Sequence, residues 1–225
     1  MPGLTEQIAT MTFATTRAWY KGGIKAANKA YDIDGRVKYR DGTVKRSQAV
    51  LPGSATDIRD HNAALASKLI TERRAEMKGK TPLESGKILY AMNEQRAGNC
   101  GEMACVAMHI AHAFGGVPAE KLFVKLVEGK AAKFAFSHQF LVILKLDDDT
   151  SAPPQGATGP ADTAWAVDPW ANICCPVSRF ATEFAAQMTH WTQVGKRIQA
   201  TKGHSTMWCE PSHACVLASA QEATE

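Results

Sequence analysis

The stretch that organises this chain is Arg96-Ala97-Gly98-Asn99-Cys100-Gly101-Glu102-Met103-Ala104-Cys105. It delivers Cys100 to the first turn of an apolar helix, where unpaired N–H groups and the partial positive charge of the helix N-terminus favour a thiolate. Gly98 and Gly101 allow the backbone to bend and a substrate to approach closely. Alternatively, Gly98-Asn99 is only a helix start and Cys100 a small buried apolar residue. The stretch alone leaves both interpretations open.

Two downstream motifs favour a nucleophile. Ser137-His138-Gln139-Phe140 opens an apolar strand-like run, and Ala164-Trp165-Ala166-Val167-Asp168-Pro169-Trp170 ends another. A polar residue at the edge of such a run is held by a rigid scaffold and can face a cleft. We therefore interpret Cys100, His138 and Asp168 as a catalytic triad. His138 takes the thiol proton and later gives it to the leaving amine, while Asp168 sets the tautomer and orientation of the imidazole.

Further residues around the cysteine are candidates for substrate and oxyanion binding. The backbone N–H of Cys100 is one expected oxyanion donor, and a side-chain amide from Gln95 or Asn99 is the second. We favour Gln95, because Asn99 is equally well explained as a cap or turn residue. Glu102 complements the helix N-terminus, although a carboxylate so close to the cysteine disfavours a thiolate. Trp170 is expected to cover the catalytic pair rather than to contact substrate.

The composition predicts one globular domain. The chain has 225 residues, of which 45% are hydrophobic and 21% charged, enough for a full core. We interpret residues 1–225 as a single catalytic domain, in which 1–50 form an N-terminal helical and hairpin extension, 95–170 the catalytic core and 147–162 a flexible loop. The net charge of +4 is mild. No basic patch interleaved with aromatic residues points to nucleic acid.

The sequence shows no secretory leader and no run of 18 apolar residues that would span a membrane. We therefore expect synthesis in a cytosol, with the six cysteines kept mostly as thiols. A specialised secretion system needs no such leader, so export into a target cell stays open.

Periodicity, turn residues and caps predict most of the elements. Thr81-Pro82-Leu83-Glu84 is a capping box with proline at the first helical position. Asp41-Gly42 predicts a hairpin with a two-residue turn. The expected helices span 4–20, 56–77, 82–93, 100–114 and 176–189. The expected strands span 122–127, 138–146 and 164–168. Residues 191–225 show no clear pattern.

Two groups of residues have side chains that bind metals. One group falls on a single helix face at positions i, i+4 and i+7: Cys105, His109 and His112. Core packing and surface histidines explain it better, since no fourth ligand is evident. The other group is denser but matches no zinc spacing: His204, Cys209, His213 and Cys215. We expect neither a metal nor a cofactor.

In combination, Gly98-Asn99-Cys100-Gly101-Glu102, Ser137-His138-Gln139-Phe140 and Trp165-Ala-Val-Asp168-Pro169-Trp170 resemble the papain-like and transglutaminase-like cysteine enzymes. The closest likeness is to the compact Cys-His-Asp proteases and protein glutamine deamidases that bacteria deliver as effectors or toxins. The resemblance covers residues 95–170, by motif and order. It implies an α+β fold with a papain-like core, in which a helix carrying the cysteine packs on a small antiparallel sheet carrying the histidine and aspartate.

These observations predict a thiol hydrolase that acts on protein amide bonds. Helix-rich, strand-rich and helical segments follow one another, so we expect the helices to gather on one side of the sheet. Only residues 169–225 follow Asp168, which leaves little chain to wall an extended peptide groove. A narrow slot for one glutamine side chain is therefore favoured. The expected activity is that of a glutamine deamidase acting on a protein of a host or competitor cell. The alternatives are a protease, a transglutaminase and a non-catalytic binding module.

Overall fold

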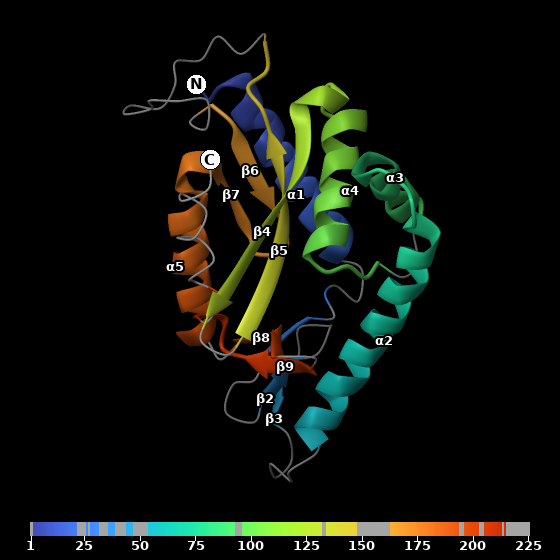
Figure 1. The fold of residues 1–225 in the computed structure, drawn as a ribbon, viewed down its shortest axis with the longest axis vertical. Coiled ribbons are helices and arrows are strands. Elements are labelled where there is room, and N and C mark those ends of the chain that lie inside the picture. The colour runs from blue at the N-terminus through green and yellow to red at the C-terminus, as the bar shows by residue number, and fades with distance from the viewer. Residues whose placement is uncertain are drawn as a thin grey trace.

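The computed structural model describes residues 2–21, 26, 28–31, 36–38, 44–46, 54–92, 96–131, 134–147, 163–193, 196–202, 205–212 and 214. Figure 1 shows the arrangement of the elements. The α-helices are α1 (Leu4–Lys21), α2 (Ser54–Met77), α3 (Pro82–Ala91), α4 (Cys100–Ala113) and α5 (Phe180–Gln193). The strands are β1 (Lys29–Tyr31), β2 (Arg36–Lys38), β3 (Val44–Arg46), β4 (Leu122–Ala131), β5 (Phe134–Ile143), β6 (Trp165–Asp168), β7 (Ile173–Pro176), β8 (Lys196–Lys202) and β9 (Ser205–Cys209).

The fold is of the α+β class, as the sequence predicts. Seven strands form one sheet in the order β1-β8-β5-β6-β7, with β4 pairing β5 and β9 pairing β8. Each of these strand pairs is antiparallel. Strands β2 and β3 form a separate two-stranded sheet. In the described part of the chain, no helix combines the length and the apolar character needed to cross a membrane.

The main sheet divides along β5. One edge of β5 pairs with β4 over the whole length of the strand. On the other edge, β6 pairs with residues 141–143, whereas β8 pairs at Ala135. Between these two contacts, residues 136–140 have no partner strand on this edge within the described ranges. We call this opening the fork. Figure 1 shows β6 and β7 leaving β5 in one direction and β8 and β9 in the other.

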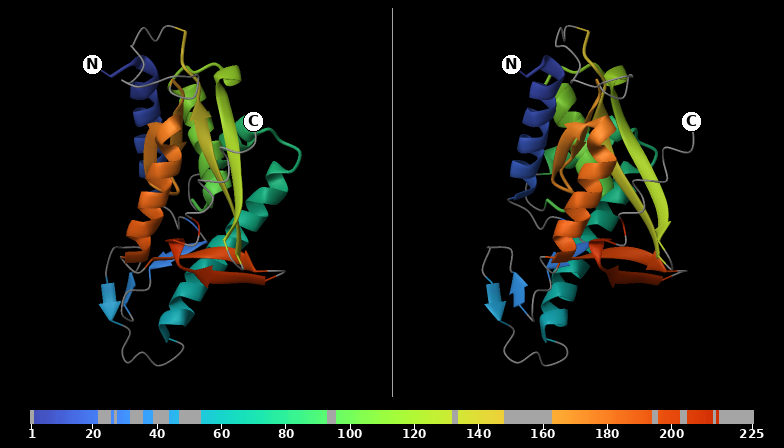
Figure 2. Two further views of the ribbon diagram at one scale, coloured as in Figure 1. Left: turned by 60° about the vertical axis from the view of Figure 1, so that its left-hand side comes forward. Right: turned by 90° about the vertical axis from the view of Figure 1, so that its left-hand side faces the viewer.

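Helices cover both faces of the sheet. Phe140 and Leu141 are consecutive in β5, and their side chains are 2% and 0% exposed. Consecutive strand residues point to opposite faces. Phe140 stacks on Phe180 of α5, while Leu141 packs with Ala9 of α1 and Ala107 of α4. The expectation that the helices gather on one side was therefore wrong, and Figure 2 shows α1 and α5 flanking the strands.

Local signals predicted the ends of the central helices well. The side chain of Thr81 accepts the N–H of Glu84, and the carboxylate of Glu84 accepts the N–H of Thr81, so the capping box of α3 is confirmed. Helix α3 ends at Ala91, two residues before the expected end. Helix α4 is followed by Gly115 and by Gly116, whose φ of 68° lies in the left-handed region. The predicted termination of α4 at these glycines is confirmed.

Other boundaries differ from the sequence prediction. Strand β5 begins at Phe134, so that His138 lies in the middle of a strand and not at its start. Helix α5 begins at Phe180 after a short 3₁₀ turn and continues to Gln193. Strands β1, β7, β8 and β9 were not predicted. Strands β1 and β7 have only three and four residues, and β9 lacks alternation, whereas the alternation around Ile198 and Ala200 in β8 was overlooked. Most of the predicted loop, residues 148–162, lies outside the described residues.

The predicted hairpin exists, but its register is different. Lys38 pairs with Val44, and Arg36 with Arg46. A two-residue turn at Asp41-Gly42 would instead place Lys38 opposite Lys45, because such a turn pairs the residues directly beside it. The register of β2 and β3 therefore does not match a two-residue turn at Asp41-Gly42. The turn itself lies outside the described residues.

Candidate active site

Cys100 is the first residue of α4 and is half-buried. Its neighbour Asn99 is the N-cap and has an extended backbone conformation. The backbone N–H of Asn99 donates to Oε2 of Glu102 at 3.0 Å. This bond is one half of a capping box and fixes the first turn of the helix. The sulfur therefore lies where the helix macrodipole favours negative charge.

His138 and Asp168 form a fully buried pair on neighbouring strands. Nε2 of His138 lies 2.5 Å from Oδ2 of Asp168, and both side chains are 0% exposed. The other carboxylate oxygen, Oδ1, accepts the backbone N–H of Ala171 at 2.8 Å. Because an ionised carboxylate can only accept hydrogen bonds, Nε2 carries a hydrogen. Nδ1 is then the nitrogen left free to exchange a proton.

Cys100 is one of the groups that shift the pKa of this histidine. Burial lowers the pKa of His138, but the charge of Asp168 and its hydrogen bond to the ring outweigh burial. Hydrogen bonding and charge from Cys100 add to the effect, so that the pKa of His138 is raised from 6.5 to about 10. Nδ1 has no partner with full hydrogen-bond geometry among the described residues. Cys100 therefore influences the ring, while no described residue forms a well-aligned hydrogen bond to Nδ1.

Aromatic rings enclose the imidazole. Ring centroids lie 4.9 Å from that of His138 for Trp170 and 5.1 Å for Phe184. Phe136 and Phe140, the side chains two positions away on β5, stack at 6.1 and 6.3 Å. These contacts fix the orientation of the ring and exclude water from it. Trp170 has no exposed surface, so it covers the histidine and would have to move to touch a substrate.

Asn28, just before β1, ties together the segments that follow Asp168 and precede Cys100. Its side-chain oxygen accepts the indole N–H of Trp170 at 2.8 Å. Its backbone N–H donates to Oδ1 of Asn99 at 3.2 Å. The ammonium of Lys29 donates to the backbone oxygen of Trp170 and lies over its ring, 4.8 Å from the centroid. No sequence signal points to residues 28 and 29, because their partners are remote in the chain.

The residues predicted to bind the oxyanion or the substrate differ in what the structure shows of them. Gln95 lies outside the described residues. The side-chain oxygen of Asn99 is engaged by the backbone of Asn28. A Cβ atom added to Gly101 would lie 2.3 Å from Oε1 of Gln139. The amide of Gln139 thus rests directly on the backbone after Cys100. Gln139 was not predicted to belong to the site, although the glycine at position 101 was a signal of close approach.

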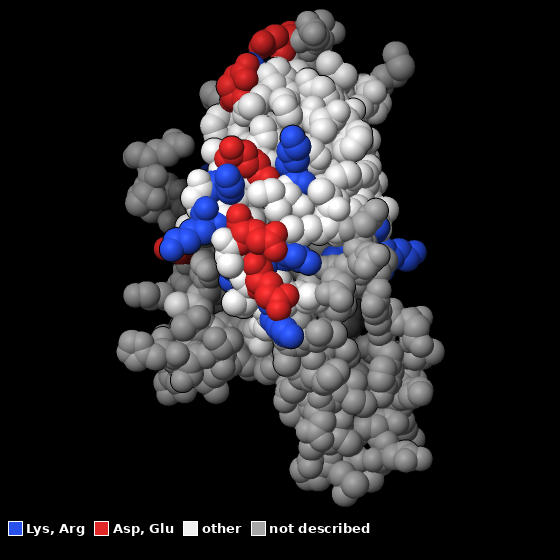
Figure 3. All heavy atoms as spheres, turned by 90° about the vertical axis from the view of Figure 1, so that its right-hand side faces the viewer, with Lys and Arg blue, Asp and Glu red and all other residues white. Residues whose placement is uncertain are grey.

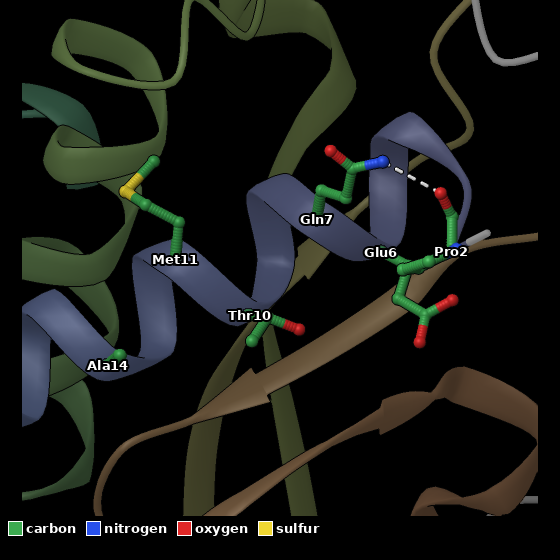
Figure 4. A pocket seen from close by; sticks show the side chains of 6 residues that line it. All are labelled: Pro2, Glu6, Gln7, Thr10, Met11 and Ala14. Carbon is green, nitrogen blue, oxygen red and sulfur yellow. Dashed lines mark hydrogen bonds between the residues drawn. The ribbon is translucent and has the colours of Figure 1, made fainter.

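Several other features carry no comparable chemistry. Within the described ranges, no group of three or more His, Cys, Asp or Glu side chains is arranged to hold a metal. His204, His213 and Cys215 lie outside those ranges. A shallow groove on α1 contains none of the sequence-predicted site residues (Figure 4) and is lined by Pro2, Glu6, Gln7, Thr10, Met11 and Ala14. On the face drawn in Figure 3, basic side chains are interspersed with acidic ones.

Two features of the site are therefore established. His138 and Asp168 form a buried, hydrogen-bonded imidazole–carboxylate pair, and Cys100 at the N-terminus of α4 contributes to the raised pKa of His138. Comparison with protein-family models, with curated proteins and with solved structures finds no match to this chain.

Proposed function

We propose that this protein is a cysteine-dependent hydrolase of protein amide bonds, with Cys100 as nucleophile, His138 as acid and base, and Asp168 as the group that orients the imidazole. One observation carries this proposal. The buried His138 gives Nε2 to Asp168 and leaves Nδ1 to the thiol at the start of α4. A buried nitrogen without a hydrogen-bond partner lowers the stability of the fold. A role of Nδ1 in proton transfer would explain why this cost is retained.

The finer fold assignment is also part of the proposal. We propose a papain-like, transglutaminase-like core built from α4, β5 and β6. The cysteine at the helix N-terminus, the histidine in an antiparallel strand and the aspartate at the end of the next strand support it. So does their order in the chain, Cys-His-Asp.

The proposed reaction begins with the proton of the Cys100 thiol on His138, because a pKa of about 10 leaves that ring protonated at neutral pH. The thiolate forms a C–S bond to the side-chain carboxamide of a glutamine, and the electron pair of the C=O bond moves onto oxygen. The backbone N–H of Cys100 donates to that oxygen. His138 then protonates the nitrogen, which leaves as ammonia. Water attacks the thioester and returns a proton to His138, so that glutamate and the free thiolate are formed.

Deamidation is favoured over proteolysis because the thiol lies at a partly enclosed position. Cys100 is half-buried at the start of α4, and His138 is fully buried. A single side chain reaches such a thiol more easily than a main chain that must pass on both sides. We propose a protein of a host or competitor cell as the substrate, reached by export.

The decisive experiment is incubation of the protein with cell lysate, followed by proteomics and an assay of released ammonia. A deamidase raises the mass of a particular glutamine by about 1 Da, whereas a protease creates new N-termini. Incorporation of an added primary amine would identify a transglutaminase. Cys100→Ala must abolish the signal, and Cys174→Ala, which changes a half-buried thiol on β7, must keep it. If neither deamidation, nor new N-termini, nor amine incorporation is detected under any condition, the result favours the non-catalytic binding module.

A further inference from the structure

Glu102 presents an electrostatic difficulty for a thiolate at Cys100. Its side chain is 5% exposed, and it lies in the first turn of α4, two residues after the cysteine. A buried carboxylate in this position repels a neighbouring negative charge, and burial itself makes an unpaired charge costly. The site therefore requires a positive group that offsets Glu102.

Arg74, in the last turn of α2, meets this requirement. Its Nε donates to Oε1 of Glu102 at 2.6 Å, a short, charge-assisted hydrogen bond. The second oxygen, Oε2, accepts the backbone N–H of Asn99. Both carboxylate oxygens therefore accept an N–H group, one from Arg74 of α2 and one from the N-cap residue Asn99.

Arg74 also interacts with the cysteine itself. The hydrogen bond to Glu102 raises the pKa of Arg74, burial lowers it, and the charges of Glu102 and Cys100 raise it further. The contribution from Cys100 is the smallest of these, and the side chain of Arg74 is 58% exposed. The main contact of Arg74 in this site is its hydrogen bond to Glu102.

Among the described residues, the other ionisable groups that the charge of Glu102 affects are Tyr20 and Cys105, and neither is a cation. Tyr20 of α1 is fully buried, and burial together with the charges of Glu102 and Cys105 raises its pKa well above 10. Burial raises the pKa of Cys105, one turn further along α4, to about 12, and the charge of Glu102 adds to this. Both groups stay neutral at ordinary pH. His138 acts on the thiol from β5, with Asp168 of β6 behind it.

We propose that Arg74 is a positioning residue of this site, which sets the reactivity of Cys100 by balancing the buried charge of Glu102. This inference rests on the proposed function only in giving Cys100 the role of nucleophile. The balance makes helix α2 part of the site, although α2 lies outside the residues 95–170 that carry the sequence motifs.

The test measures how fast Cys100 is alkylated by iodoacetamide as a function of pH, by mass spectrometry of the peptide that contains it. Arg74→Gln is expected to move the midpoint of this profile upward by about 0.5 to 1 pH unit, because an exposed arginine acts at the lower end of the range for ion pairs. Below the midpoint the rate then falls about three- to tenfold. Glu102→Gln is expected to move the midpoint downward.

The double variant Arg74→Gln/Glu102→Gln separates charge balance from structure. Charge balance returns its midpoint to that of the parent protein, whereas a structural defect would persist or grow. Arg73→Gln is the matched control, since it removes the same charge from the next position of α2, where Arg73 pairs with Glu76. Its profile should not move.

A midpoint for Arg74→Gln equal to that of Arg73→Gln would overturn the inference, as would a double variant that remains shifted. If Arg74→Gln does not fold, Arg74→Lys and the double variant carry the test, and both must keep the parent midpoint. The alkylation profile needs no substrate. The predicted shifts without any release of ammonia or new N-termini would therefore refute the proposed hydrolase and leave the role of Arg74 intact.

Discussion

Asp168 holds Nε2 of His138 at 2.5 Å, and neither side chain reaches the surface. The two residues lie on different strands, 30 positions apart in the chain. Their contact lies at the fork, where the edge of β5 is left open between β6 and β8. Within the described ranges, no partner strand lies beside His138 on this edge of β5.

Replacing Asp168 by Asn is expected to lower turnover about 10²- to 10⁴-fold, because the loss of the carboxylate releases the tautomer and orientation of His138. Steady-state turnover on an identified substrate checks this. The rate of Cys100 alkylation should fall in parallel. Asp147→Asn is the control, since Asp147 pairs with Lys121 on the surface, and it should change neither rate. An Asp168→Asn variant with parent turnover would rule out the orienting role.

The cysteines are expected to differ sharply in reactivity. Burial raises the pKa of Cys105 and of Cys175 to about 12 and that of Cys174 to about 11, with nearby charges contributing. Burial raises that of Cys209 as well. Cys100, beside His138, should therefore be alkylated at least about tenfold faster than these four at neutral pH. Peptide-level mass spectrometry after a short pulse of iodoacetamide measures the order, and equal rates would contradict an activated thiol.

Stability should decrease at high pH because of His138. Its pKa in the fold, about 10, lies above the value of 6.5 for a free side chain. The folded state therefore binds the proton more tightly than the unfolded chain. This contribution is fully present below pH 6.5 and is lost as the pH rises through 10. Urea unfolding at pH 6, 8 and 10 should show a falling free energy of unfolding. His138→Gln should flatten that dependence, and an unchanged slope would count against the buried ion pair.

Two glycines should respond differently to alanine. A Cβ atom at Gly86 of α3 would lie 2.0 Å from the backbone oxygen of Cys105, which cannot move without separating α3 from α4. Gly86→Ala should therefore destabilise the fold by about 1–3 kcal/mol or more. At Gly101 the obstacle is the end of the flexible Gln139 side chain. Gly101→Ala should cost less stability and act mainly on turnover. Thermal unfolding and turnover of both variants test the contrast, and an equal loss of stability would contradict it.

Asn28→Ala is expected to leave the buried indole N–H of Trp170 without its acceptor. An unsatisfied buried donor costs about 1–3 kcal/mol. Because Trp170 covers His138, turnover should also fall. Asn28→Asp keeps an acceptor and should restore both properties in part. Gln7→Ala, which removes an exposed amide from α1, is the control for the loss of a side-chain hydrogen bond. An Asn28→Ala variant as stable as the parent protein would show that the hydrogen bond between Asn28 and Trp170 does not contribute to the stability of the fold.

The sequence by itself determined the elements whose signals are local. The capping box at Thr81 and Glu84, the glycines after α4 and the apolar runs of β5 and β6 placed these elements within a few residues, because the interactions that start and end them join near neighbours in the chain. The identification of Cys100, His138 and Asp168 as one constellation remains a prediction about catalysis. His138 and Asp168 are hydrogen-bonded, and Cys100 contributes to the raised pKa of His138.

Only the tertiary structure decided how that constellation is held. Arg74 reaches Glu102 across 28 positions, and Asn28 reaches Trp170 across 142. The short strands β1 and β7 carry little local signal, and they pair with β8 and β6 in the main sheet. Such contacts depend on which surfaces the packed helices and strands bring together, since burial and hydrogen bonding act between chain segments wherever folding places them.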